Sequence, residues 1–237
     1  MFNGVVPADC VGTLSDGVST IDVVVLDCTP VSAAPAPVPR TGQTTCYDEL
    51  GTLVPCAGTG QDGEFQKGVT LPTPRFTDHG NGTITDNLTG LIWLKNANCP
   101  NRYINWPTAR TYIAELNSTG TMNGISCGDT SGAGNTHQTD WRMPNVRELF
   151  SLLNFGFIHP VISNAAGTGN GTSSDPFSNF AAVSGGGLNF WSSTTMLWRS
   201  NHAYRVDLYE GHVAEENKNG DEFLNGQSYV IAVRGGS

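Results

Sequence analysis

The residue types that most often carry catalysis or bind metals occur in this chain without the spacing that such chemistry needs. The histidines are His79, His137, His159, His202 and His212. No two of them have the short spacing of paired zinc ligands on one helix face. Ser192 and Ser193 lie outside a Gly-x-Ser-x-Gly nucleophile motif, and the chain has no glycine-rich phosphate loop. We therefore predict no catalytic residue, no metal site and no cofactor, and we expect a protein that is not an enzyme.

One acidic segment has some of the features of a calcium-binding loop. The segment Asp78-x-Gly80-Asn81-Gly82-x-x-x-Asp86 offers carboxylate and amide oxygens at close spacing. It lacks the EF-hand spacing and the glutamate that would bind the ion with both oxygens. Asn-Gly between two strand-like arms is also the strongest short hairpin signal. We therefore favour a plain hairpin over residues 75–86.

The cysteines predict disulfides and an oxidising compartment. They are Cys10, Cys28, Cys46, Cys56, Cys99 and Cys127, an even number without a Cys-x-x-Cys pair. Pairing between neighbours would join Cys10 to Cys28, Cys46 to Cys56 across a hairpin that turns near residues 49–51, and Cys99 to Cys127. Reduced thiols in a cytosolic protein are the alternative. Bridged cysteines imply an exported protein, extracellular or at the cell surface, although the first residues lack the basic and apolar regions of a leader.

Composition excludes several classes of partner. The chain has 12 Lys and Arg against 21 Asp and Glu, which gives a net charge of -9. Such an acidic chain is unsuited to bind nucleic acid or an anionic lipid surface. No apolar run approaches the roughly 20 residues of a membrane helix, so we expect no direct membrane insertion. Apolar residues make up 38% of the chain, which is too many for a disordered protein.

The elements that must position any site follow an N-terminal module. Residues 1–29 contain one predicted strand, at 21–26, and residues 30–40 form a Pro- and Ala-rich linker that we expect to be extended. The main domain is predicted to span residues 41–237. After the hairpin at 75–86, we predict a buried strand at 91–94 and a helix over 106–117 capped by Asn105. A second helix begins after Pro144, with Asn145 and Glu148 as a variant capping box.

The C-terminal third of the chain has a different character. Residues 163–189 are rich in Gly, Ser and Asn without periodicity, so we expect a long irregular stretch there. Strands are predicted at 190–194, 203–208, 211–214 and 229–233. Val206 and Leu208 alternate with Arg205, Asp207 and Tyr209, so one face of that strand should be core and the other exposed. Two helices, short strands and a long loop region together predict an α+β fold.

A series of short motifs follows in order along the main domain. They are Pro74-Arg75-Phe76-Thr77-Asp78, the run from Gly80 to Trp93, the run from Asp140 to Leu149, Phe190-Trp191-Ser192-Ser193-Thr194 and Val233-Arg234-Gly235-Gly236. In this order they resemble the Lcl C-terminal-domain family of bacterial surface proteins, over roughly residues 41–237. The resemblance implies a C-type-lectin-like α+β fold with two helices, short mixed antiparallel sheets and a binding site on a long irregular region. A small β-containing N-terminal segment would precede this domain.

The same resemblance implies a binding surface in the C-terminal segment. Members of the family serve as variable proteins of diversity-generating retroelements, in which a reverse transcriptase rewrites adenines in a C-terminal stretch. Apparent framework residues (Ala203, Val206, Leu208, Gly211 and Val213) alternate here with chemically unrelated ones. We predict that the segment of about 196–224 binds ligand through Leu197, Trp198, Arg199, Ser200, Asn201, His202, Tyr204, Arg205, Asp207, Tyr209, Glu210, His212, Glu215 and Glu216. Aromatic anchors with adaptable polar neighbours suit such recognition.

The predicted function is therefore non-enzymatic binding of a macromolecular ligand, a protein or a glycan, on another cell or surface. The collagen-like adhesin of the family recognises sulfated polysaccharide, but the acidity of this chain and its three lysines (Lys67, Lys95 and Lys218) argue against that ligand. The Glu-Pro-Asn and Trp-Asn-Asp signatures of calcium-dependent lectins are absent. One alternative is a structural subunit of a surface assembly, or a homo-oligomer, built through residues 1–40. Another is an oxidase of the formylglycine-generating type, which shares the lectin-like fold and depends on active-site cysteines.

The remaining motif residues have predicted structural roles. Trp93, Trp141 and Trp191 lie in framework motifs and should be core, whereas the pattern leaves Trp198 open between ligand contact and partial burial. We expect Asp140 and Arg142 to form an internal ion pair that orders the turn before the second helix. Arg234 should be structural as well.

Overall fold

The structure is a computed structural model that describes residues 38–180, 187–220 and 228–236. These residues form a mixed fold with few helices and several small antiparallel sheets. The elements are β1 (Cys46–Tyr47), β2 (Leu53–Val54), α1 (Asp62–Phe65), β3 (Phe76–Asp78), β4 (Thr83–Asp86), β5 (Ile92–Leu94), α2 (Trp106–Thr119), β6 (Thr121–Met122), β7 (Ile125–Ser126), the 3-10 turn η1 (Ala133–Asn135), α3 (Val146–Phe150), β8 (Asn189–Thr195), β9 (His202–Asp207), β10 (His212–Asn217) and β11 (Val233–Arg234). The predicted strand at 21–26 and the Cys10–Cys28 bridge lie outside the described residues.

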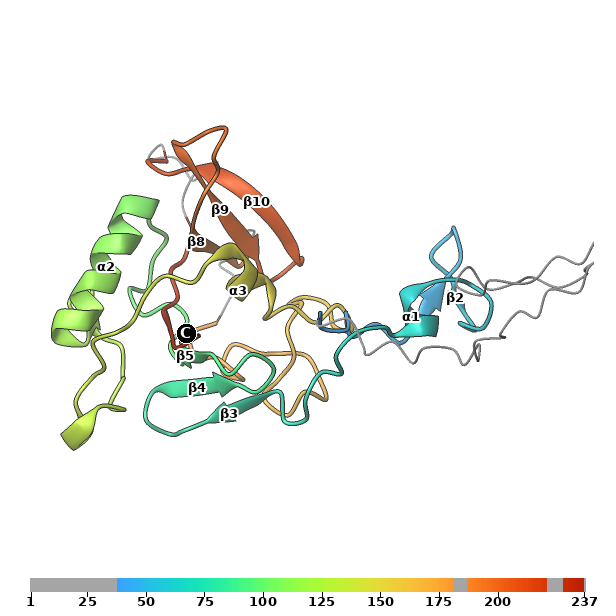
Figure 1. Ribbon diagram of the computed structural model, residues 1–237, viewed down its shortest axis with the longest axis horizontal. Helices are drawn as coiled ribbons and strands as arrows, with labels where there is room; N and C mark the ends of the chain where they lie inside the picture. Colours follow the sequence, from blue (N-terminus) through green and yellow to red (C-terminus); the bar gives the residue numbers. More distant parts are fainter. Residues whose placement is uncertain (1–37, 181–186, 221–227, 237) are drawn as a thin grey trace, which may run out of the picture.

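Two sheets frame the main part of the fold. One has the strand order β10-β9-β8 and the other β11-β5-β4-β3. Figure 1 shows these sheets at opposite ends of the domain, with α2 on one flank and the β1–β2 hairpin with α1 set apart. Pairing of Val233 with Trp93 joins the last strand to β5, which follows the β3–β4 hairpin. The last strand of the chain therefore belongs to the sheet that β3, β4 and β5 form.

Both predicted helices are present and begin at their predicted caps. The Asn105 side chain accepts the N–H of Thr108 at 3.0 Å, and α2 ends at Thr119 rather than at residue 117. At α3 the Asn145 side chain and the Glu148 carboxylate form the predicted capping box. Helix α1 was not predicted, because its four residues have no side-chain cap and no room for a periodic apolar face.

The hairpin at 75–86 forms as predicted, but its turn is longer than a two-residue Asn-Gly turn. The N–H of His79 donates to the carbonyl of Thr83 at 3.1 Å. Gly82 has a φ of 84°, and a Cβ there would lie 2.0 Å from a carbonyl oxygen of Gly128, so only glycine fits. The carboxylates that a calcium loop would need are engaged elsewhere: Asp78 with Lys95, and Asp86 with the buried Arg75.

The core has two parts, one on each side of the β8–β9 strand pair. Phe190 and Val206 belong to one cluster of buried residues, whereas Trp191, which follows Phe190, and Ala203, three residues before Val206, belong to the other. Adjacent residues of a strand point to opposite faces, so both faces of this strand pair are covered near its centre. The framework tryptophans at 93, 141 and 191 are buried, as predicted.

The predicted Asp140–Arg142 ion pair is wrong. Arg142 instead makes two 2.7 Å hydrogen bonds to the Glu148 carboxylate, and Asp140 lies 2.8 Å from Arg234. The backbone of Arg142 pairs with that of Val233, which brings Arg234 beside Asp140. The predicted strand at 229–233 is also corrected, because only Val233 and Arg234 form a strand and the residues before them are buried irregular chain.

Two predicted disulfides are present. Cys46 bonds to Cys56 across the β1–β2 hairpin, whose turn lies at residues 48–52, and Cys99 bonds to Cys127. Within the described ranges, no helix has the length and apolar character to span a bilayer.

Candidate ligand-binding surface

The loop between β8 and β9 carries the most exposed part of the predicted binding set. Leu197 is 92% exposed and Trp198 is 71% exposed, whereas Met196 before them is buried. The guanidinium of Arg199 lies over the Trp198 ring, 4.6 Å from the ring centroid. We name residues 197–199 the apolar tip. Large apolar side chains exposed together in this way are typical of protein interaction sites.

Hydrogen bonds hold the backbone of this loop in place. The N–H of Met196 donates to the carbonyl of His202 at 3.1 Å. Lys218, directly after β10, binds the loop: its N–H donates to the carbonyl of Asn201 at 2.8 Å and its ammonium group to the carbonyl of Ser200 at 2.9 Å. No pattern in the sequence singled out Lys218. The tip is thus presented on an ordered backbone, which reduces the entropy lost on binding.

The strand residues of the predicted set lie on both faces of the sheet. Tyr204 pairs with Glu215 across β9 and β10, and Tyr204 lines a cavity on the face where α3 packs. Arg205 lies on the opposite face, where its guanidinium is 3.5 Å from the Glu216 carboxylate. Alternate residues of β9 therefore point to two faces of the sheet that are both partly covered. The prediction that one face is core and the other is exposed to solvent is wrong.

Asp207 is buried, so the prediction that it lies on an exposed face is wrong. It is 3% exposed. Its carboxylate accepts the N–H groups of Tyr209 at 2.7 Å and Glu210 at 3.3 Å, and the side-chain amide of Asn189 at 3.2 Å. Strand β9 ends at this residue, and the carboxylate closes the turn into β10 instead of meeting solvent.

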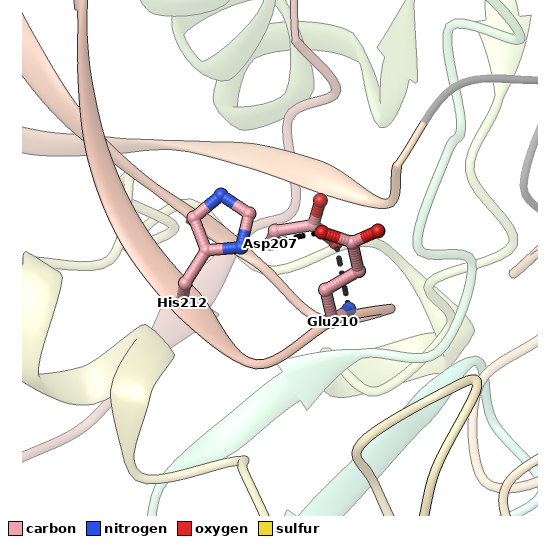
Figure 2. A group of neighbouring side chains, drawn as sticks. All are labelled: Asp207, Glu210 and His212. Atoms are coloured by element: carbon pink, nitrogen blue, oxygen red, sulfur yellow. Dashed lines mark hydrogen bonds and ion pairs between the residues drawn. The ribbon is translucent and has the colours of Figure 1, made fainter.

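Glu210 and His212 lie beside Asp207 at the same turn, as Figure 2 shows. One ligand atom from each of the three residues lies within 4.8 Å of the others. Two carboxylates and an imidazole are a donor set that divalent metals accept. The Asp207 carboxylate is already engaged by backbone and amide N–H groups, however. These contacts assign the Asp207 carboxylate to closing the turn.

The residues around this turn divide between framework and surface. Tyr209 stacks on His159, with ring centroids 4.7 Å apart. Gly211 has a φ of 82°, and a Cβ there would lie 3.1 Å from the Phe155 ring, so its framework role is confirmed. Val213 is 41% exposed on the edge strand β10, so its predicted framework role is wrong.

The loop and turn residues of the predicted binding set thus form two groups near opposite ends of β9, and the strand residues Tyr204, Arg205, Glu215 and Glu216 lie between them. Residues 197–201 belong to the β8–β9 loop and 209–211 to the β9–β10 turn, while His202 and His212 begin β9 and β10. At about 3.3 Å per residue, a strand of this length separates the two ends by roughly 20 Å. A ligand that contacts both groups must span that distance. Residues 221–224 of the predicted segment lie outside the described residues.

Comparison with known families agrees with the sequence motifs. A family model described as the Lcl C-terminal domain matches residues 82–234. The match covers more than half of the chain and contains both groups of predicted contact residues. It begins at residue 82, whereas the motifs extended the resemblance back to about residue 41. No curated protein matches the chain at a significant level.

Proposed function

Because the chain belongs to the Lcl C-terminal domain family, we propose that it is an exported, non-enzymatic protein that binds a macromolecular ligand through the apolar tip. Membership of this family suggests a surface or ligand-binding protein. Our finer proposal is an adhesin-like domain of C-type-lectin-like fold that serves as the variable protein of a diversity-generating retroelement. Its ligand would be a protein or a glycan on another cell or surface.

The exposure of the apolar tip is the observation that supports this proposal best. The side chains of Leu197 and Trp198 are exposed to water on the β8–β9 loop. The backbone of the loop residues beside them is held by hydrogen bonds. Covering such area on binding is favourable by about 25 cal/mol per Å². A rigid aromatic anchor beside a guanidinium is also the combination most often found at interface hot spots.

The cysteines support export and speak against the oxidase alternative. In the described part of the chain, Cys46, Cys56, Cys99 and Cys127 are all bridged. Disulfides persist in oxidising compartments, which favours an exported protein. A bridged cysteine offers no thiolate for catalysis. We therefore propose that these cysteines serve stability alone.

The test compares two double variants that remove side chains of equal exposure. Leu197→Ser with Trp198→Ala removes the tip. Leu50→Ser with Ile158→Ala removes side chains that are 91% and 70% exposed elsewhere on the surface. Fluorescently labelled full chain is titrated onto a panel of bacterial and host cells and onto a glycan array.

The wild-type chain and the Leu50/Ile158 control should bind the same targets, and the tip variant should lose at least about tenfold in affinity, as expected when hot-spot side chains are truncated. Equal binding by the tip variant and the control would overturn the proposal. The retroelement part is tested in the surrounding DNA. We expect a near-identical repeat that differs at adenines, next to a reverse transcriptase gene, and its absence would remove that part alone.

A further inference from the structure

A cavity of about 560 Å³ lies where the segment before β1, helix α3 and the β9–β10 strand pair meet. Apolar side chains form most of its wall, among them Val38, Phe150 and Val213, which are 58%, 43% and 41% exposed. The volume is within the range of sites for small organic ligands. Apolar side chains from three separate parts of the chain are thus left open to water around one hollow.

Two arginines line this cavity without an ion-pair partner. Within the described ranges, no carboxylate forms an ion pair with Arg40 or Arg147. Arg40 donates from Nε to the carbonyl of Gly68 at 3.3 Å, which leaves its terminal nitrogens available. Arg147 lies on the exposed side of α3. In a chain with 21 Asp and Glu, these two guanidinium groups without an ion-pair partner beside one apolar cavity are open to an anionic ligand.

We propose that this cavity binds a small amphipathic carboxylate, whose apolar body lies against Phe150 and Val213 and whose carboxylate is held by Arg147 and Arg40. A guanidinium group binds a carboxylate through two parallel N–H bonds, and desolvation of the apolar body supplies the remaining affinity. Tyr204, which also lines the cavity, adds a phenol that can donate to the same carboxylate.

This inference goes beyond the proposed function. The residues of the apolar tip do not line the cavity, and the ligand is a small molecule instead of a macromolecule. A second copy of the chain is a poor occupant, because each copy carries a net charge of -9 and the two would repel each other.

Calorimetric titration of the full chain with sodium decanoate, below its micelle concentration, tests the proposal. Decyltrimethylammonium has the same tail and a cationic head, and the net charge of the chain alone would favour it. We expect saturable binding of one decanoate per chain, at least about tenfold tighter than binding of the cation. Absence of saturable decanoate binding, which would also follow if residues 1–37 or a second copy filled the cavity, overturns the proposal. Equal binding of both amphiphiles overturns it too.

Matched variants locate the site. Arg147→Gln and Arg40→Gln should each weaken decanoate binding by about tenfold, and neither should weaken binding of the cation, because each removes a positive charge. Arg102→Gln makes the same change in charge at an exposed arginine that does not line the cavity, and should have no effect. Phe150→Ser should weaken both amphiphiles. Thermal unfolding verifies that each variant folds, and wild-type affinity in both Arg147→Gln and Arg40→Gln would overturn the assignment.

Discussion

At the scale of single residues, Asp129 shows how one carboxylate orders irregular chain. It is 6% exposed and accepts the indole N–H of Trp141 at 2.8 Å, the N–H of Gln138 at 2.8 Å and the N–H of Ser131 at 2.9 Å. Burial opposes ionisation, but these hydrogen bonds outweigh it and hold the pKa of Asp129 below its ordinary value of 3.8. Its stabilising effect is therefore complete above that value and is lost as the pH falls through the lowered pKa.

Asp129→Asn is expected to lower the free energy of unfolding by about 2–3 kcal/mol near neutral pH. In asparagine an NH2 group replaces one carboxylate oxygen. This NH2 group cannot accept a hydrogen bond, so buried N–H groups around it lose their partner. Because asparagine does not titrate, the difference from wild type should shrink as the pH falls through the lowered pKa of Asp129. Urea unfolding between about pH 7 and about pH 2 measures both effects. Glu49→Gln, at an exposed carboxylate, is the control, and a difference that is constant with pH would contradict the assignment.

The sequence identified Asp140 and Arg142 as members of ion pairs, but the partners predicted for them were wrong. Asp140 and Arg142 are close in sequence, but Arg142 binds Glu148 and Asp140 binds Arg234. The first of these contacts is local, whereas the second depends on the backbone of Val233 pairing with that of Arg142. Such a contact between distant parts of the chain leaves no signal in local spacing. Asp207 was misplaced for a related reason, because alternation along a strand cannot show that the carboxylate turns back to close the next turn.

At the scale of elements, prediction succeeded where a local chemical signal exists. Asn105 and Asn145 cap the helices that follow them, since an Asn side chain can accept the free N–H groups of a first turn whatever surrounds it. The run at 229–232 read as a strand because it is apolar, yet it is buried and makes only isolated backbone pairing, such as that of Tyr229 with Phe190. An apolar pattern shows burial, but it does not show a continuous ladder. The split of the binding set between two ends of β9 likewise depends on tertiary packing.

The two bridges of the described chain should differ in their effect on stability. The Cys99–Cys127 bridge joins residues 28 apart, on either side of α2, while the Cys46–Cys56 bridge joins residues 10 apart within the hairpin that Figure 1 shows set apart. Loop entropy predicts a loss of about 3.5 kcal/mol for Cys99→Ala with Cys127→Ala. For Cys46→Ala with Cys56→Ala we expect a local effect, with the main thermal transition unchanged. Differential scanning calorimetry of the two double variants distinguishes these outcomes. If the midpoint of the main transition falls equally in both variants, the hairpin unfolds together with the domain.

At the scale of the whole molecule, framework and binding surface share the same strands. Within β9, Val206 belongs to the core while Tyr204 lines the cavity, and the apolar tip follows directly from the buried Met196. Substitutions in the β8–β9 loop remove few buried contacts, whereas substitutions in β9 disturb both halves of the core. The β8–β9 loop can therefore accept many different side chains at less cost in stability than β9 can.

The overall charge sets which anions the molecule accepts. We expect the full chain to pass through a heparin column unretained at about 0.15 M salt, where charges interact over about 8 Å. A long polyanion must lie across a surface whose net charge is -9, so repulsion from the many carboxylates outweighs attraction to a few guanidinium groups. Decanoate contacts only the cavity beside Arg40 and Arg147, so the same chain should bind it in the same buffer. Retention on heparin that salt abolishes would contradict this account, since the surface would then carry a cationic stripe long enough for a polysaccharide.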